Sequence, residues 1–555
     1  MWVLTYAAIG TLFTASVAQQ PVVTTTLGTL KGLTLETISG RPFHGFQGVP
    51  YAKPPVGKHR FKQSIPGDRW TGIYNATRPS EMCIQKVTSF LLPNSPLDVF
   101  GSEDCLYLNI FTPKLPSEGA DGKLLDVIVY IHGGGFRAAA GNVWGPSILL
   151  DRDVVLVTFN YRLGMMGFLS FGDSVMPGNN GLKDQTLALQ WVKNHIADFG
   201  GDPNKVTIAG MSAGGASVHY HMLSPLSKGL FQKAIANSGS ALNPWAMNRN
   251  ARKTGLAFAQ AIGCPTNDTT VTLKCLRERP AGHLLNSADS IESELSIKFV
   301  PVVEPVGPKA FIDEDPVDLI KSKAGSDVPA LFSYCDDEGS EFALPSLADE
   351  KKESEIENNW NELLLNKLLF GESDKTNEVS QTIRKHFLDN KKVNENLQGY
   401  SKMFGERYFI DGIQKAAILH AEHQSSPVYS YRFSFRTPKG FNALELVYAR
   451  LQYEGGSSHG NDNSFLFNAM YLKPIQEFPE LLPMTKYMTD VWMKFIEQTG
   501  QSDWLTVKSA LPKFTYLDIW NSDPSKNTFK SEEPVGLFWD SLNLHRHNST
   551  PISYH

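Results

Sequence analysis

A serine between glycines is the first candidate for chemistry in this chain. It lies in Gly210-Met211-Ser212-Ala213-Gly214, a G-x-S-x-G pattern. The pattern alone is weak, because at average glycine and serine contents a chain of this length contains it by chance about one time in five. Its context is more specific: the apolar run 205–209 leads into it, and 216–223 can continue as a helix. This predicts a nucleophile elbow, a tight strand–turn–helix that presents the Ser212 hydroxyl at the helix N-terminus.

A second glycine run, His132-Gly133-Gly134-Gly135-Phe136, follows the apolar run 125–131. A flexible loop and a phosphate-binding loop are the alternatives, but neither the G-x-G-x-x-G nor the Walker spacing is present here. Consecutive glycines leave backbone N–H groups accessible, which suits an oxyanion hole. We expect Gly134, Gly135 and Ala213 to donate to the oxygen that becomes negative, where the loss of one donor raises the barrier by about 2.7–4 kcal/mol.

A serine nucleophile needs a base, and the base needs an acid that orients it. The chain has 14 histidines, so composition does not select one. His219 and His221 would lie on the helix after the serine, where a structural role is favoured. His459 lies in the glycine-rich segment 454–462, from which a side chain can reach a sheet edge.

The acidic triplet Asp336-Asp337-Glu338 follows the apolar run 328–334. It therefore stands between the serine and His459, in the order that the nucleophile elbow predicts for the acid. The residues themselves do not choose among the three carboxylates. A solvated acidic turn is an equally good interpretation of the triplet.

Strand and helix patterns alternate around these residues. The runs 125–131, 154–159 and 205–209 are short and rich in β-branched residues, which predicts buried strands. Residues 184–199 space their apolar side chains like a helix with one apolar face. This alternation predicts an α/β fold, a large and mostly parallel sheet with helices on both faces.

The later part of the chain contains further helical patterns. Residues 346–400 are charged and helix-prone, and 487–498 form an amphipathic pattern. We expect them to form a cap or side lobe on the same domain.

Composition excludes several classes of protein. Apolar residues make up 41% and charged residues 20% of the 555, so the chain is neither disordered nor collagen-like. Lys and Arg number 52 and Asp and Glu 57, a net charge of −5 without a block of like charge. This balance gives no electrostatic support for a nucleic-acid partner.

Residues 1–18 are predicted to be a secretory signal, because the apolar run 2–13 is followed by the small residues Ser16 and Ala18. The run is short for a membrane span, which needs about 20 apolar residues, so no membrane anchor is expected. The sequence thus predicts a secreted, extracellular protein. Three sequons are the expected glycosylation sites: Asn75, Asn267 and Asn548.

With these motifs in place, the sequence resembles the type-B carboxylesterase and cholinesterase family of α/β-hydrolases across essentially the whole mature chain. It is most similar to the secreted insect carboxylesterases. The motifs that carry the resemblance are FQGVPYAKPPVGKHRF (46–61), EDCLYLNIF (103–111), NYRLG (160–164), GNNGLKDQ (178–185) and GGDP (200–203).

The resemblance implies a single α/β-hydrolase domain over 19–555 and assigns the remaining roles. It makes Glu338 the acid and His459 the base. It makes Trp245 a wall of the acyl pocket. It places Ser238 near the elbow, where core packing is an equal alternative.

The same resemblance implies how the five cysteines are used. Cys83 would pair with Cys105 and Cys264 with Cys275, while Cys335 would stay unpaired beside the acidic triplet. From spacing alone, fifteen arrangements remain open.

The resemblance also implies a secreted serine esterase that acts on small-molecule esters by two-step acyl transfer, without a metal or organic cofactor. Met211 stands where cholinesterases have a glutamate and juvenile hormone esterases usually have a glutamine. As a soft apolar side chain it is expected to line a pocket for uncharged groups. A juvenile hormone esterase stays an alternative, because Gly456, His459 and Asp462 satisfy its G-x-x-H-x-x-D pattern. The other alternative is a non-catalytic ligand-binding or adhesion protein, although such relatives generally lose the nucleophile.

Overall fold

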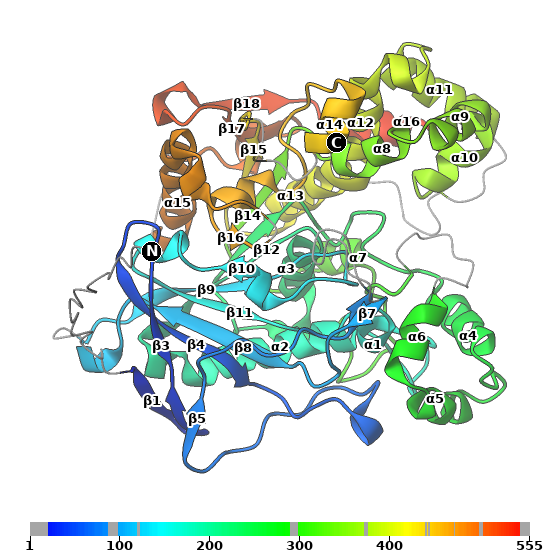
Figure 1. Cartoon of the computed structure of the whole chain (residues 1–555). Helices are drawn as coiled ribbons and strands as arrows, with labels where there is room; N and C mark the ends of the chain where they lie inside the picture. Colours follow the sequence, from blue (N-terminus) through cyan, green and yellow to red (C-terminus); the bar gives the residue numbers. More distant parts are fainter. Residues whose placement is uncertain are drawn as a thin grey trace, which may run out of the picture.

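The computed structural model describes residues 20–86, 98–118, 122–288, 298–370, 376–438, 441, 445–470, 472–498 and 503–543. At its centre lies an eleven-stranded sheet of order β18-β17-β15-β14-β13-β12-β9-β11-β8-β4-β3 (Figure 1). In chain order the strands are β3 (Leu33–Glu36), β4 (Pro42–Pro50), β8 (Tyr107–Thr112), β9 (Leu125–Ile131), β11 (Val154–Phe159), β12 (Gly201–Met211), β13 (Lys233–Asn237), β14 (Ala330–Cys335), β15 (Val428–Phe433), β17 (Phe514–Ile519) and β18 (Thr528–Glu532).

The seven strands from β17 to β11 run parallel to one another. The strands at the two edges pair antiparallel. At one edge β18 pairs with β17, and at the other β8 pairs with β11, β4 with β8 and β3 with β4. The central strands are buried on both faces, which explains why their sequences are continuous apolar runs. The predicted α/β fold with a large, mostly parallel sheet is confirmed.

Helices cover both faces of this sheet. Val127 and Val129 of β9 belong to one apolar core, together with α2 (Asn180–His195), α3 (Ala213–Leu223) and α13 (Asp411–His423). Ile128 and Tyr130 belong to a second core, together with α15 (Leu482–Glu497). Because successive side chains of a strand point to opposite faces, this alternation places the two cores on the two sides of the sheet.

Helix α2 begins earlier than its apolar pattern suggests. The pattern predicts a helix from 184, whereas α2 begins at Asn180, ends at His195 and continues as a 3-10 turn over Ile196–Phe199. Its first half is polar yet buried: Asp184 binds Arg162 at 2.7 Å and Lys183 binds Glu304 at 2.6 Å. These buried ion pairs replace apolar contacts, so the apolar periodicity misses this half of the helix.

The predicted side lobe is a group of helices at the upper right of Figure 1, with an apolar core of its own. The helices are α8 (Ser340–Leu347), α9 (Glu350–Asn358), α10 (Trp360–Lys367), α11 (Thr376–Leu388) and α12 (Leu397–Gly405). The prediction that 487–498 also belongs to this lobe is wrong: all but the last of these residues lie in α15, which packs on one face of the central sheet because its apolar side chains belong to that core.

Two disulfides join Cys83 to Cys105 and Cys264 to Cys275, the pairs that the family resemblance implies. Cys335, at the end of β14, is a buried free thiol. Of the helices in the described ranges, none combines the length and the apolar character needed to cross a membrane. The predicted signal 1–18 and the sequon at Asn548 fall outside the described residues.

Candidate active site

Ser212 occupies a sharp turn between β12 and α3, with φ 59° and ψ −122°. The turn is tight on both sides: a Cβ on Gly210 would lie 2.6 Å from Gly214, and one on Gly214 would lie 2.0 Å from the Ile131 carbonyl oxygen. Only glycine fits at these two positions. Ser212 stays partly exposed at the N-terminus of α3, as the elbow pattern predicts.

The glycine run 132–136 passes directly beside this turn. A Cβ on Gly133 would lie 3.1 Å from the Cβ of Ser212. Gly134 and Gly135 have φ of +97° and +63°, a region that favours glycine. Among the described residues, no acceptor takes the backbone N–H groups of Gly134, Gly135 or Ala213. These three groups are therefore free to bind an oxyanion next to Ser212.

His459 and Glu338 form a buried pair. Nδ1 of His459 donates to Oε2 of Glu338 at 2.5 Å, and their side chains are 5% and 0% exposed. The other oxygen of Glu338 accepts from the Ser238 hydroxyl at 2.5 Å and from the Cys335 backbone N–H at 2.7 Å. Within the described part of the chain, Nε2 of His459 has no hydrogen-bond partner. The imidazole is thus oriented by one nitrogen and free to accept a proton at the other.

The other two carboxylates of the acidic triplet hold the histidine loop in place. Asp336 accepts from the backbone N–H of Ser457 at 2.8 Å. Asp337 accepts from the backbone N–H of Gly456 and from the Tyr453 hydroxyl, both at 2.9 Å. The structure thereby distinguishes three carboxylates that the residues alone leave equivalent: Glu338 contacts the imidazole, and its two neighbours fix the loop that carries it.

Opposing effects set the pKa of His459. Burial disfavours the imidazolium and lowers the pKa, whereas the charges of Glu338, Glu341 and Asp462 and the hydrogen bond to Glu338 raise it. The net effect is a raised pKa. The surroundings therefore favour the imidazolium that forms when His459 accepts a proton.

An aromatic wall that sequence reasoning missed lies against His459. The centroid of the Phe409 ring is 4.3 Å from that of the imidazole, and the centroid of the Phe342 ring is 5.4 Å from it. Phe409 lies in a π-helical turn, η9 (Glu406–Ile410), between α12 and α13. The carbonyl of Tyr408 in this turn accepts from the Trp245 indole N–H at 2.8 Å, and the Trp245 ring is 5.7 Å from Phe409. π-Helical turns are frequent at functional sites, but their sequence signal is weak.

The other residues singled out from the sequence have clear positions. Met211 is 8% exposed and packs beneath the histidine loop. Asp462 is buried and accepts from the Tyr431 hydroxyl at 2.7 Å. Asn75 and Asn267 are exposed.

The two histidines of α3 have structural partners. His219 contacts His420 at 2.8 Å, and His221 contacts Gln185 at 2.9 Å. Burial lowers the pKa of His219, His221 and His420, so these three histidines are held neutral in the core.

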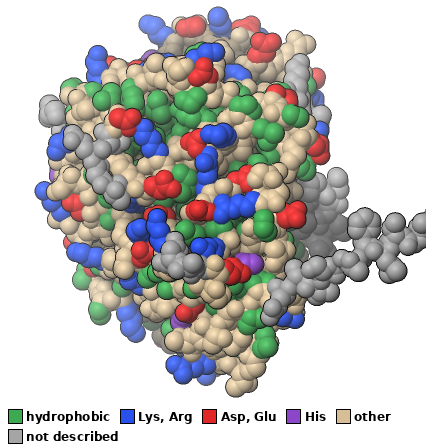
Figure 2. Space-filling model, turned by 90° about the vertical axis from the view of Figure 1, so that its left-hand side faces the viewer, with side chains coloured by type: hydrophobic (Ala, Val, Ile, Leu, Met, Phe, Trp, Pro, Cys, Tyr) green, Lys and Arg blue, Asp and Glu red, His purple; other side chains and the backbone are tan. Residues whose placement is uncertain are grey.

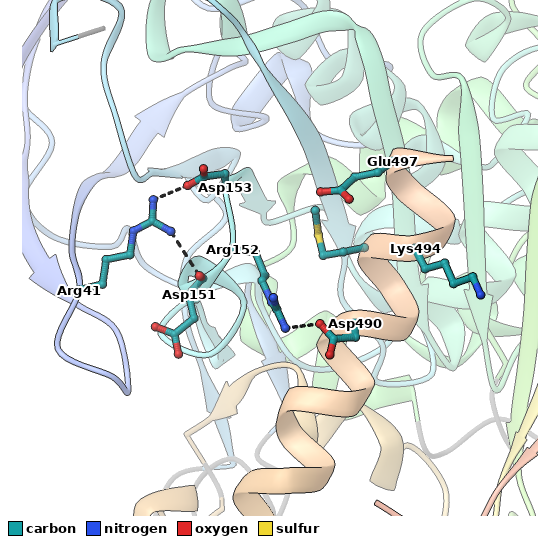
Figure 3. A pocket seen from close by; sticks show the side chains of 8 residues that line it. Arg41, Asp151, Arg152, Asp153, Asp490, Lys494 and Glu497 are labelled. Carbon is teal, nitrogen blue, oxygen red and sulfur yellow. Dashed lines mark hydrogen bonds and ion pairs between the residues drawn. The ribbon is translucent and has the colours of Figure 1, made fainter. Parts of the chain in front are cut away.

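A groove of about 580 Å³ lies away from these residues, between Arg41 and helix α15 (Figure 3). Two ion pairs span its lining: Arg41 binds Asp153, and Arg152 binds Asp490. Of the described residues that line it, none is a histidine, serine or cysteine. On the face shown in Figure 2, Lys and Arg side chains likewise lie among Asp and Glu side chains. The groove offers no nucleophile, and Ser212 remains the candidate.

Comparisons with known proteins found one family model and several similar proteins. The model of the carboxylesterase family matches residues 19–533. A carboxylic ester hydrolase of Bombus ignitus is 37% identical over 95% of each chain, and a juvenile hormone esterase of Tribolium castaneum is 35% identical over 86% of this chain and 83% of its own. The crystal structure of juvenile hormone esterase from Manduca sexta, with OTFP covalently attached, is similar with a TM-score of 0.79 and 29% identity, over 95% of this chain and 99% of that one.

Proposed function

The chain belongs to the carboxylesterase family of hydrolases, and from this membership we propose that it hydrolyses uncharged carboxylic esters with Ser212, His459 and Glu338 as its catalytic residues. The observation that carries the proposal is the imidazole of His459, which is bonded to Glu338 through Nδ1 and whose Nε2 has no partner among the described residues. A histidine held in this way is a general base for a serine hydroxyl.

In the proposed reaction, Ser212 Oγ attacks the ester carbonyl while Nε2 of His459 takes its proton. The backbone N–H groups of Gly134, Gly135 and Ala213 bind the oxyanion. The imidazolium then protonates the leaving alcohol, and an acyl-enzyme remains on Ser212. Water repeats the same steps, with its proton passing to His459, and releases the carboxylic acid.

Uncharged substrates are proposed because Met211 replaces the carboxylate that cholinesterases place before the nucleophile. The aromatic wall of Trp245, Phe409 and Phe342 adds further apolar surface near His459. A juvenile hormone ester is the second candidate substrate, since two similar proteins are juvenile hormone esterases.

We further propose that the protein is secreted and carries glycans on Asn75 and Asn267. Two disulfides support an oxidising compartment, and both asparagines are exposed.

A fluorophosphonate probe tests the catalytic proposal. The folded protein should be labelled on Ser212, as located by peptide mass spectrometry, and Ser212→Ala should abolish the labelling. Absence of labelling in the folded wild type would instead favour the non-catalytic binding protein.

A side-by-side comparison of naphthyl acetate and acetylthiocholine then tests the preference for uncharged esters, which should be at least about tenfold in kcat/KM.

A further inference from the structure

Glu341 is an acidic residue of the site that the proposed reaction does not use. It lies three residues after Glu338, in the first turn of α8. Glu341 and the residue after it, Phe342, are exposed, whereas the following Ala343 and Leu344 are buried in the side-lobe core. The Phe342 ring contacts the imidazole of His459. The start of α8 is therefore open to solvent and adjacent to the proposed catalytic base.

The Glu341 carboxylate differs from the other acids of the site in having no partner. Glu338 is bonded to His459, Ser238 and Cys335. The Glu341 carboxylate, in contrast, makes no hydrogen bond or ion pair within the described residues. Its charge nevertheless contributes to the raised pKa of His459. Glu341 is thus an exposed carboxylate next in sequence to Phe342, whose ring lies against the imidazole of His459.

We infer that Glu341 selects substrates by charge, admitting neutral and cationic esters and disfavouring esters with an anionic group near the reacting bond. This inference rests on the proposed function. A carboxylate beside the reacting bond acts on the charges of a bound ester, and placing a second negative charge near it is unfavourable. Because Met211 leaves the position before the nucleophile uncharged, the expected order of substrates is neutral, then cationic, then anionic esters, and Glu341 accounts for the difference between the two charged classes.

Three thioacetates with one acyl group test the inference. Acetylthiocholine carries a cation, 3,3-dimethylbutyl thioacetate is its neutral isostere, and S-acetyl-3-mercaptopropanoate carries an anion. All three form the same acetyl-enzyme, so differences in kcat/KM report the leaving group alone. The full chain should turn over the cationic thioester faster than the anionic one at low salt. Glu341→Gln should reduce this cation-to-anion ratio by at least about fivefold.

Glu350→Gln is the matched control, because Glu350 is exposed and occupies the first turn of the neighbouring helix α9. It should keep the wild-type ratio. A second readout is the pH dependence of kcat/KM for the neutral thioester. Its acidic midpoint should move to lower pH in Glu341→Gln, because His459 loses one of the anions that favour its charged form.

Two failures can be told apart. No thiol release from any of the three thioacetates by the folded wild type would contradict the proposed function itself. An active wild type that prefers the anionic thioester, or a Glu341→Gln variant whose ratio stays within about twofold of wild type, would overturn the role of Glu341 alone. The preference between the cationic and the anionic thioester is measured on the wild type, so the inference remains testable even if the Glu341→Gln variant does not fold.

Discussion

The side chain of Met211 packs directly against Gly460: a Cβ added to Gly460 would lie 2.8 Å from Cε and 3.1 Å from Sδ of Met211. Met211 precedes Ser212, and Gly460 follows His459. The residue before the proposed nucleophile thus supports the loop that carries the proposed base. Gly460 also has φ +72°, a conformation that favours glycine.

Gly460→Ala should be destabilising for two separable reasons. An alanine in the left-handed region costs about 1–2 kcal/mol, and overpacking against Met211 adds about 1–3 kcal/mol. Adding Met211→Ala to the Gly460→Ala variant should restore only the stability that was lost to overpacking. Urea unfolding and kcat/KM for naphthyl acetate, measured on the two single variants and the double variant, give the coupling energy. Strictly additive effects would contradict the contact.

Gly229→Ala is the control for backbone strain. Gly229 has a similar φ of +79°, and a Cβ there would meet nothing within 4 Å. It should show the strain without the packing term. Esterase activity should be kept, because an added Cβ at Gly229 would contact no other group.

Ser212→Ala should lower kcat by at least about a thousandfold, with the residual activity due to the oxyanion hole and substrate binding. The fold should persist, because the substitution removes only a hydroxyl. Turnover of naphthyl acetate and the melting temperature are the two measurements. Turnover within about tenfold of wild type would rule out Ser212 as the nucleophile.

Activity should be full at high pH and should fall as the pH drops through the pKa of His459, because only neutral imidazole accepts a proton. Since the pKa is raised, the midpoint for kcat/KM should lie above the usual value of about 6.5. Glu338→Gln should move this midpoint down and lower kcat, by up to about 10⁴-fold. A profile that stays flat from about pH 8 to about pH 5 would count against a histidine base.

Much of the fold follows from local sequence where one physical rule dominates. Strands β9 and β11 have the bounds that their apolar runs predict, because both faces of each strand are buried. Helix α2 is the counterexample. Its start is set by the buried pairs of Lys183 and Asp184, whose partners lie elsewhere in the chain, so the local pattern places the start four residues late.

The same limit applies to the site. The elbow and the glycine run are local features, and their residues predict them. The choice among Asp336, Asp337 and Glu338 depends on His459 and the residues before it, more than a hundred positions away. No local rule encodes this pairing, and only the family resemblance singles out Glu338. The role of Phe409 depends on a π-helical turn that has no clear sequence pattern.

The structure gives Ser238 a contact with Glu338 that its sequence motif does not predict. Core packing and a functional role are equal alternatives for it from the sequence. In the structure its hydroxyl donates to the oxygen of Glu338 that does not face His459. Ser238 adopts a φ of +49°, so the backbone holds a sparsely populated conformation at this contact.

Ser238→Ala should therefore weaken the orientation of Glu338. A hydrogen bond to a buried charge is worth about 1.5–3 kcal/mol, which corresponds to about 10- to 150-fold in kcat/KM if it acts fully in the transition state. Ser240→Ala is the matched control: its hydroxyl accepts from the Leu242 backbone N–H at 3.2 Å in the same segment. The control should lower the melting temperature and keep kcat, whereas Ser238→Ala should lower kcat and shift the acidic midpoint. Equal effects of the two variants on kcat would show that Ser238 only packs.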